Sequence, residues 1–148
     1  MAARFVDALA HMPGMDGEDS DATGAYTQID LAPDCPPTYI LLPRNKWPPH
    51  WEAQYAIPLV RLTSNLYGHP LAGLYWGQHC DAVATQKCGF QRVIGWECLY
   101  KHVELGLLLN VYVDDFKLGG AKGEALRCSS YDPMRLEMQI QIGRRRVA

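Results

Sequence analysis

The sequence has no apolar run near the roughly 20 residues that a membrane-spanning helix needs. It also has no cationic start followed by a long apolar stretch, the pattern of a secretory signal. Its five cysteines are odd in number and irregularly spaced, so no disulfide framework is indicated. These absences lead us to expect an intracellular protein, cytoplasmic or nuclear, that is neither secreted nor bound to a membrane.

The chain has no marked excess of either charge. Fourteen basic and sixteen acidic residues give a net charge of −2, so no global positive field would attract nucleic acid. The one basic cluster is Arg144-Arg145-Arg146, which is typical of a solvated tail. With 148 residues, 48% hydrophobic and 20% charged, the composition fits one globular domain with a real core.

Hydrophobic spacing predicts two helices. Residues 1–12 carry Phe5, Leu9 and Met12 at helical steps, and a longer pattern begins near Pro70 and ends before Gly89. Between them the chain is rich in proline, and short strands are expected at residues 39–42 and 55–62, with further strands at 96–100 and within 134–142. Together, these helices and strands predict an α+β fold, with an antiparallel sheet and helices packed on one of its faces.

The acidic stretch from residue 13 to residue 20 combines Asp16, Glu18 and Asp19 with two glycines. Such a composition is typical of a loop. Asp21 would therefore follow a loop and lack a strand to anchor it.

Apolar, strand-favouring residues flank Asp114 and Asp115 in the segment from Leu107 to Gly120. This pattern predicts a β-hairpin with the two aspartates at its tip. Paired carboxylates suit hard divalent cations such as Mg²⁺, although aspartates also serve as ordinary turn residues. A two-metal site needs a carboxylate from a second segment, and spacing alone leaves the candidates open: Asp16, Asp19, Asp21 and Asp30.

A zinc site is the alternative metal chemistry. Its ligands would be Cys80, Cys88, Cys98 and His102, but they lack the paired Cys-x-x-Cys spacing of structural zinc sites. Free thiols are the favoured interpretation.

Five segments in order resemble the reverse transcriptases of Copia-type (Ty1/copia) LTR retrotransposons. Tyr112-Val113-Asp114-Asp115 resembles the active-site box of reverse transcriptases, and Asp21 followed by Ala25-Tyr26 resembles their first catalytic motif. The other three segments resemble motifs of the Copia branch and are Thr38 to Pro43, Leu66-Tyr67-Gly68 with Ala72 and Trp76, and Gly89-Phe90.

This resemblance implies a polymerase palm that uses Mg²⁺, or Mn²⁺ in its place. Asp21 and Asp114 would hold both metal ions, with Asp115 beside them and the backbone carbonyl of Ala22 completing a shell. The implied catalytic residues are thus Asp21, Asp114 and Asp115.

The resemblance also implies substrate-binding residues. Tyr26 would lie under the incoming sugar and exclude a 2′-hydroxyl, while Tyr112 and Val113 would border the primer end and the template. Gly68 and Leu71 belong to the middle motif, and Leu71 stands where many family members have a glutamine that contacts the incoming nucleotide.

The implied partners are an RNA or DNA template-primer and deoxynucleoside triphosphates. Family members also carry fingers, thumb and RNase H regions, for which the stretches before Asp21 and after Asp115 are too short. We therefore divide the chain into a leader (1–20), a palm-like domain (21–120) and a C-terminal extension (121–148). The whole is expected to be a piece of a longer polyprotein.

A palm without its neighbouring regions should expose apolar surface. The residues expected there are Leu107 to Val111, Trp47, Trp51 and Trp76. The alternative function is a catalytically inactive retroelement remnant that serves as a nucleic-acid or protein interaction module.

Overall fold

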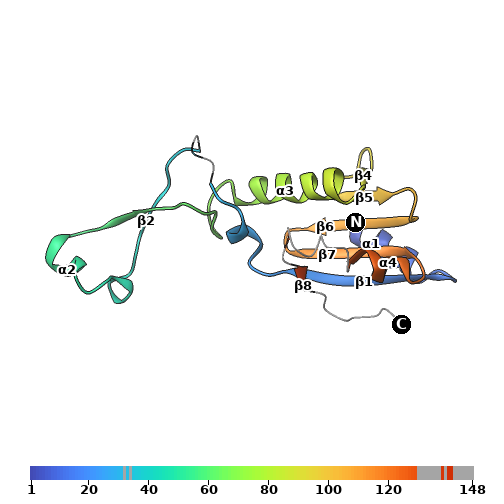
Figure 1. Cartoon of the computed structure of the whole chain (residues 1–148), viewed down its shortest axis with the longest axis horizontal. Coiled ribbons are helices and arrows are strands. Elements are labelled where there is room, and N and C mark those ends of the chain that lie inside the picture. The colour runs from blue at the N-terminus through green and yellow to red at the C-terminus, as the bar shows by residue number, and fades with distance from the viewer. Residues whose placement is uncertain (32, 34, 130–137, 139, 142–148) are drawn as a thin grey trace.

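A computed structural model describes residues 1–31, 33, 35–129, 138 and 140–141 of the chain. Its centre is a six-stranded antiparallel sheet in the order β4-β5-β6-β7-β1-β8, and β2 and β3 form a separate two-stranded sheet (Figure 1). The elements are α1 (Ala2–Ala10), β1 (Met15–Ala22), η1 (Ala25–Gln28), β2 (Tyr39–Leu41), η2 (Arg44–Lys46), α2 (Trp51–Gln54), β3 (Leu59–Arg61), α3 (Ala72–Ala82), η3 (Val83–Lys87), β4 (Gln91–Arg92), β5 (Leu99–His102), β6 (Leu107–Tyr112), β7 (Asp115–Ala121), α4 (Glu124–Ser129) and β8 (Ile140–Gln141). The predicted α+β fold is confirmed.

The hairpin of β6 and β7 lies at the middle of the sheet. Its pairs run from Leu107 opposite Gly120 to Tyr112 opposite Asp115. The predicted hairpin is therefore present, with Asp114 in its turn and Asp115 as the first residue of β7. Alternate residues Leu107, Leu109 and Val111 are buried on one face of the sheet, which is the period-two pattern of a strand.

Helices cover both faces of the sheet. On the face of Leu109, side chains from α3 and α4 join the strands in one buried cluster. The cluster comprises Ala22, Ala25, Trp76, Cys80, Val83, Ala84, Cys88, Phe90, Tyr100, Leu107, Leu109, Val111, Phe116, Leu118, Ala125, Cys128 and Met138. The prediction that the helices share one face holds for these two, whereas α1 packs on the opposite face.

Helix α1 is present as predicted, but its buried stripe is different. Val6 and Ala10 are buried, whereas Phe5 and Met12 are more than half exposed, at 56% and 53%. Ala10 lies over Gly17 of β1, where an added Cβ would come within 2.6 Å of the Ala10 Cβ. Small residues on the helix and on the strand therefore let α1 approach the sheet closely.

Residues 15–22 form β1, so the loop prediction for this acidic segment is wrong. The strand pairs with β7 from Met15 opposite Ala121 to Asp21 opposite Asp115. At Asp21 it also pairs with β8 on its other side, opposite Gln141. Asp21 is consequently anchored between two strands. The rest of the strand expected within 134–142 lies outside the described residues.

The predicted second helix is also present, as α3 followed by a single π-helical turn, η3. Trp76, expected on an exposed surface, is only 2% exposed and lies in the core, as do Leu107, Leu109 and Val111. None of the helices in the described ranges combines the length and apolar character required to cross a membrane.

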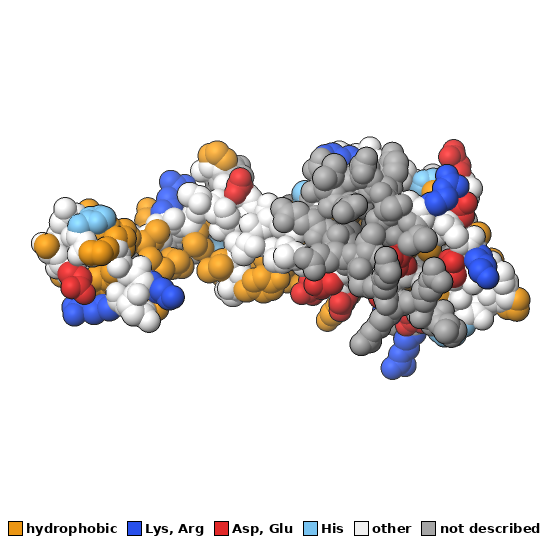
Figure 2. All heavy atoms as spheres, turned by 60° about the horizontal axis from the view of Figure 1, so that its bottom comes forward, with side chains coloured by type: hydrophobic (Ala, Val, Ile, Leu, Met, Phe, Trp, Pro, Cys, Tyr) orange, Lys and Arg blue, Asp and Glu red, His pale blue; other side chains and the backbone are white. Residues whose placement is uncertain are grey.

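Residues 38–62, called the arm below, extend away from the main sheet (Figure 1). Three-residue strands β2 and β3 pair at its base, confirming strands in both predicted regions, and the Leu62 N–H donates to the Thr38 carbonyl at 2.9 Å. Tyr39, Leu41 and Leu59 are more than half exposed. Figure 2 shows the apolar and basic side chains that the arm presents.

Lys117 of β7 joins α1 to the sheet, and we expect Lys117→Met to lower the stability by about 1 kcal/mol. Its Nζ donates to Asp7 of α1 at 2.8 Å and to Asp19 of β1 at 3.0 Å. Burial alone would lower the pKa of Lys117, but the hydrogen bonds to Asp7 and Asp19 outweigh it and the pKa is raised. Because the folded-state pKa is raised, this stabilisation is complete at neutral pH and disappears as the pH rises through that pKa.

Thermal unfolding of wild type and Lys117→Met at pH 7 and above pH 11 checks this expectation, with the exposed Lys101→Met as the control. A Tm difference that stays the same at both pH values would contradict it.

Candidate metal centre

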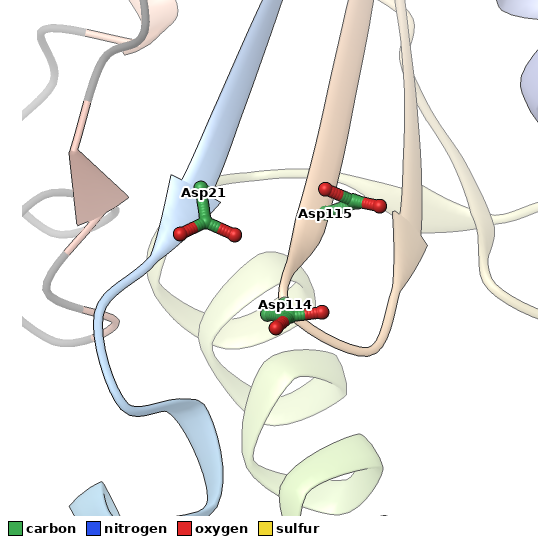
Figure 3. Close-up of side chains that lie close together, drawn as sticks. All are labelled: Asp21, Asp114 and Asp115. Atoms are coloured by element: carbon green, nitrogen blue, oxygen red, sulfur yellow. The ribbon is translucent and has the colours of Figure 1, made fainter.

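Three aspartates from two separate parts of the chain converge at one end of the sheet. Asp21 is near the end of β1, Asp115 begins β7 directly opposite it, and Asp114 lies in the turn between β6 and β7 (Figure 3). Their ligand oxygens lie within 4.8 Å of one another. Asp21 and Asp115 are exposed and Asp114 is partly buried, so solvent reaches the cluster.

The hairpin turn has only two residues, Val113 and Asp114. Val113 has φ of 55°, in the left-handed region that a β-branched residue rarely adopts. Tight hairpins place a positive φ at the first turn residue, and glycine is the usual choice there. The turn is thus locally strained, and strain of this kind persists only where surrounding contacts hold it.

Two hydrogen bonds hold this turn. The Ala22 N–H donates to the Asp114 carbonyl at 2.8 Å, which ties the turn to the end of β1. The indole Nε1–H of Trp76 donates to the Val113 carbonyl at 2.5 Å, which ties it to α3. The turn between β6 and β7 is therefore attached to both the sheet and a helix.

The carboxylates also act on a neighbouring phenol. Partial burial and then the negative charge of Asp114 raise the pKa of Tyr67, with smaller contributions from Tyr26 and Asp21. Like any tyrosine, Tyr67 is protonated at neutral pH and can donate a hydrogen bond. Three carboxylates this close repel one another unless a cation balances them, and their hard oxygen ligands match Mg²⁺ and Mn²⁺.

The predicted substrate-binding residues lie at several positions. Tyr26 lies in η1, with its ring 4.6 Å from that of Tyr67, whose neighbour Gly68 has φ of 94°. Tyr112 ends β6 and is 70% exposed on the face of the sheet that carries Asp115. Leu71 directly precedes α3, where it is 37% exposed and its N–H donates to the His69 ring.

Sequence reasoning missed the role of Trp76 in this centre. It assigned Trp76 to an exposed surface, whereas the side chain is buried against the hairpin turn. The signal was present in the spacing, because Ala72, Trp76 and Cys80 recur every four residues and form the buried face of α3.

The alternative zinc ligands do not come together. Within the ranges that the structure describes, the three aspartates are the metal-capable side chains that converge as a group. No such group is formed by Cys80, Cys88, Cys98 and His102. None of the five cysteines forms a disulfide bond, and burial raises the pKa of the Cys80 thiol to about 12. A zinc-binding thiolate would need the opposite shift.

We therefore expect a strong zinc chelator to leave the far-ultraviolet circular dichroism and the Tm unchanged, because structural zinc would otherwise be part of the folding energy. Cooperative unfolding on chelation, reversed by added Zn²⁺ but not by Mg²⁺, would restore the zinc alternative.

No family model matches the chain. Parts of it are nevertheless similar to retrotransposon polyproteins. Over 60 residues, 40% of this chain, it is 35% identical to the Transposon Ty1-DR4 and TyH3 Gag-Pol polyproteins of Saccharomyces cerevisiae. It is 33% identical over 60 residues to the Truncated transposon Ty1-A Gag-Pol polyprotein of the same yeast. These similarities support a retrotransposon origin.

The aligned stretch is a small part of each relative. It covers 4% of the Ty1-DR4 polyprotein, 3% of the TyH3 polyprotein and 5% of the truncated Ty1-A polyprotein. The similarity fits a fragment of a longer polyprotein.

Proposed function

We propose that this chain is the palm portion of a retrotransposon reverse transcriptase, with its three aspartates as a divalent-metal centre for nucleotidyl transfer. The observation that carries the proposal is the convergence of Asp21 with Asp114 and Asp115 within 4.8 Å. The two segments are far apart in sequence, and both lie in motifs that resemble reverse transcriptases. The similarity to Gag-Pol polyproteins is in accord with it.

In this proposal, Asp21 and Asp114 hold Mg²⁺ or Mn²⁺, Asp115 lies beside them, and the Ala22 carbonyl adds a ligand. Metal ions bound there would lower the pKa of the primer 3′-hydroxyl and neutralise charge on the triphosphate during in-line attack. The carboxylates fit such ions in charge, ligand type and solvent access.

Aromatic side chains near the aspartates supply the substrate contacts of the proposal. Tyr26 would pack against the incoming deoxynucleotide sugar, and its contact with the Tyr67 ring limits the positions open to it. Tyr112 is exposed beside Asp115, where it would border the primer end, with Val113 next to it. Gly68 and Leu71 complete the proposed substrate-binding set, with a template-primer and deoxynucleoside triphosphates as the ligands.

Binding of Mn²⁺ or Mg²⁺, measured by calorimetry, tests the proposal. We expect the double variant Asp21→Asn, Asp114→Asn to bind the metal at least tenfold more weakly than the wild type, because it loses ligands from both segments. The double variant Glu97→Gln, Glu104→Gln removes the same charge from other exposed positions and should bind as the wild type does. Equal affinity in all three proteins would refute a metal centre at these aspartates.

The arm favours the second candidate function, an inactive remnant that serves as an interaction module. Besides its exposed apolar residues, it carries three basic residues, Arg44, Lys46 and Arg61, and one acidic residue, Glu52. Exposed aromatic and basic side chains together can bind single-stranded nucleic acid. A binding module would keep its affinity for an oligonucleotide on Asp114→Asn, whereas a polymerase centre would lose metal-dependent function.

A further inference from the structure

We infer that Trp76 is a positioning residue for Asp114, and that its indole N–H holds the hairpin turn in the conformation that aims this carboxylate at the metal. The inference rests on the proposed metal centre. It starts from the turn itself, where a β-branched valine has φ of 55°. Such a conformation is strained and relaxes unless other contacts maintain it.

The Trp76 hydrogen bond acts on the peptide group between Val113 and Asp114. Its acceptor is the Val113 carbonyl, 2.5 Å from the indole nitrogen. A peptide unit is planar, so fixing this oxygen also fixes the amide nitrogen of Asp114 and the direction of its Cα. The next peptide group is fixed as well, because the Asp114 carbonyl accepts from the Ala22 N–H. Asp114 is thus held through the peptide groups on both of its sides, by α3 and by β1.

The indole is suited to this task. The Trp76 side chain is 2% exposed, belongs to the buried cluster and stacks on His79 with ring centroids 5.7 Å apart. A buried, packed ring has few rotamers, and an indole has only one hydrogen-bond donor, so that donor has a single direction. Figure 3 shows α3 passing beneath the turn that carries Asp114.

Replacing Trp76 with phenylalanine removes the hydrogen-bond donor and keeps an aromatic ring in the core. Trp76→Phe removes the N–H, frees the strained turn and should weaken Mn²⁺ binding about three- to tenfold, the effect of one lost hydrogen bond. Trp47→Phe is the matched control, because the Trp47 indole donates to the Leu42 carbonyl at 2.8 Å in the arm. It loses the same kind of bond and should bind Mn²⁺ as the wild type does.

A second measurement needs no metal. Amide hydrogen exchange of Ala22 reports on its bond to the Asp114 carbonyl, and it should accelerate in Trp76→Phe but not in Trp47→Phe. Unchanged Ala22 exchange in a folded Trp76→Phe protein overturns the inference. If no metal binds even to the wild type while Ala22 exchange still accelerates, the proposed function fails and the positioning role of Trp76 stands.

The wild type itself gives a third measurement should Trp76→Phe fail to fold. Mg²⁺ binding should shift the nuclear magnetic resonance signal of the Trp76 indole N–H and leave that of Trp47 unchanged, because only the former bonds to the aspartate turn. Equal or absent shifts in a wild type that binds the metal overturn the inference.

Discussion

Gly120→Ala should destabilise the protein by about 3 kcal/mol, because the added methyl group has no space. Gly120 lies on β7 opposite Leu107, and its Cβ would come within 2.5 Å of the Gly106 carbonyl and 3.1 Å of the Leu107 Cα. Both obstacles are backbone atoms of the paired strand and its turn, so no side-chain rotation relieves the clash. The strand itself would have to move, and with it the hairpin that carries Asp114.

Gly77→Ala is the matched control. Gly77 lies in α3, where nothing is within 4 Å of an added Cβ, and alanine is the better helix former. It should stabilise the protein by roughly 0.5–1 kcal/mol. Chemical denaturation of both variants measures the difference, and a Gly120→Ala protein as stable as the wild type would contradict the close packing at this position.

Phe116→Ala should lower the free energy of unfolding by about 3–5 kcal/mol, the usual range for deleting a buried aromatic side chain. Phe116 is 1% exposed, follows Asp115 directly and pairs across the hairpin with Val111. Its removal leaves a cavity beneath the strand that holds Asp115, and neighbours fixed in the sheet can fill that cavity only in part.

Tyr112→Ala is the comparison, since Tyr112 is an aromatic residue on the same hairpin but is 70% exposed. Its stability change should stay within about 0.5 kcal/mol. Denaturant titrations followed by circular dichroism would separate the two variants. If both variants lost the same stability, Phe116 would contribute no more to stability than a surface residue.

The hairpin and the convergence of its aspartates with Asp21 could be anticipated because strand-favouring residues and recognisable motifs mark them locally. Strand β1 could not, because its residues are those of a turn. What makes Asp19 acceptable in a strand is its partner Lys117, and what makes Gly17 acceptable is the alanine packed above it. Lys117 is 98 positions from Asp19 along the chain, and the contact of Ala10 with Gly17 depends on how α1 folds back onto the sheet, so propensity alone predicted a loop.

The helices also show what the sequence pattern alone does not predict. Their existence followed from apolar spacing, but the buried face of α1 did not, because its larger side chains were assumed to lie inside. Val6 and Ala10 are buried in place of Phe5, since the sheet beneath α1 presents glycines and accepts only small residues. The indole bond of Trp76 to the hairpin turn lies beyond periodicity altogether, because it depends on how α3 crosses the sheet.

The pairing of β1 with β7 also has a consequence for the order of folding. The hairpin that positions Asp114 and Asp115 is local and forms in microseconds, whereas Asp21 is 94 positions from its partner (115 − 21). Closing so long a loop is slow, so the third carboxylate would arrive late in folding. A cation that needs all three would then bind after the rate-limiting step and act chiefly by slowing unfolding, which would make the lifetime of the native state depend on the metal concentration.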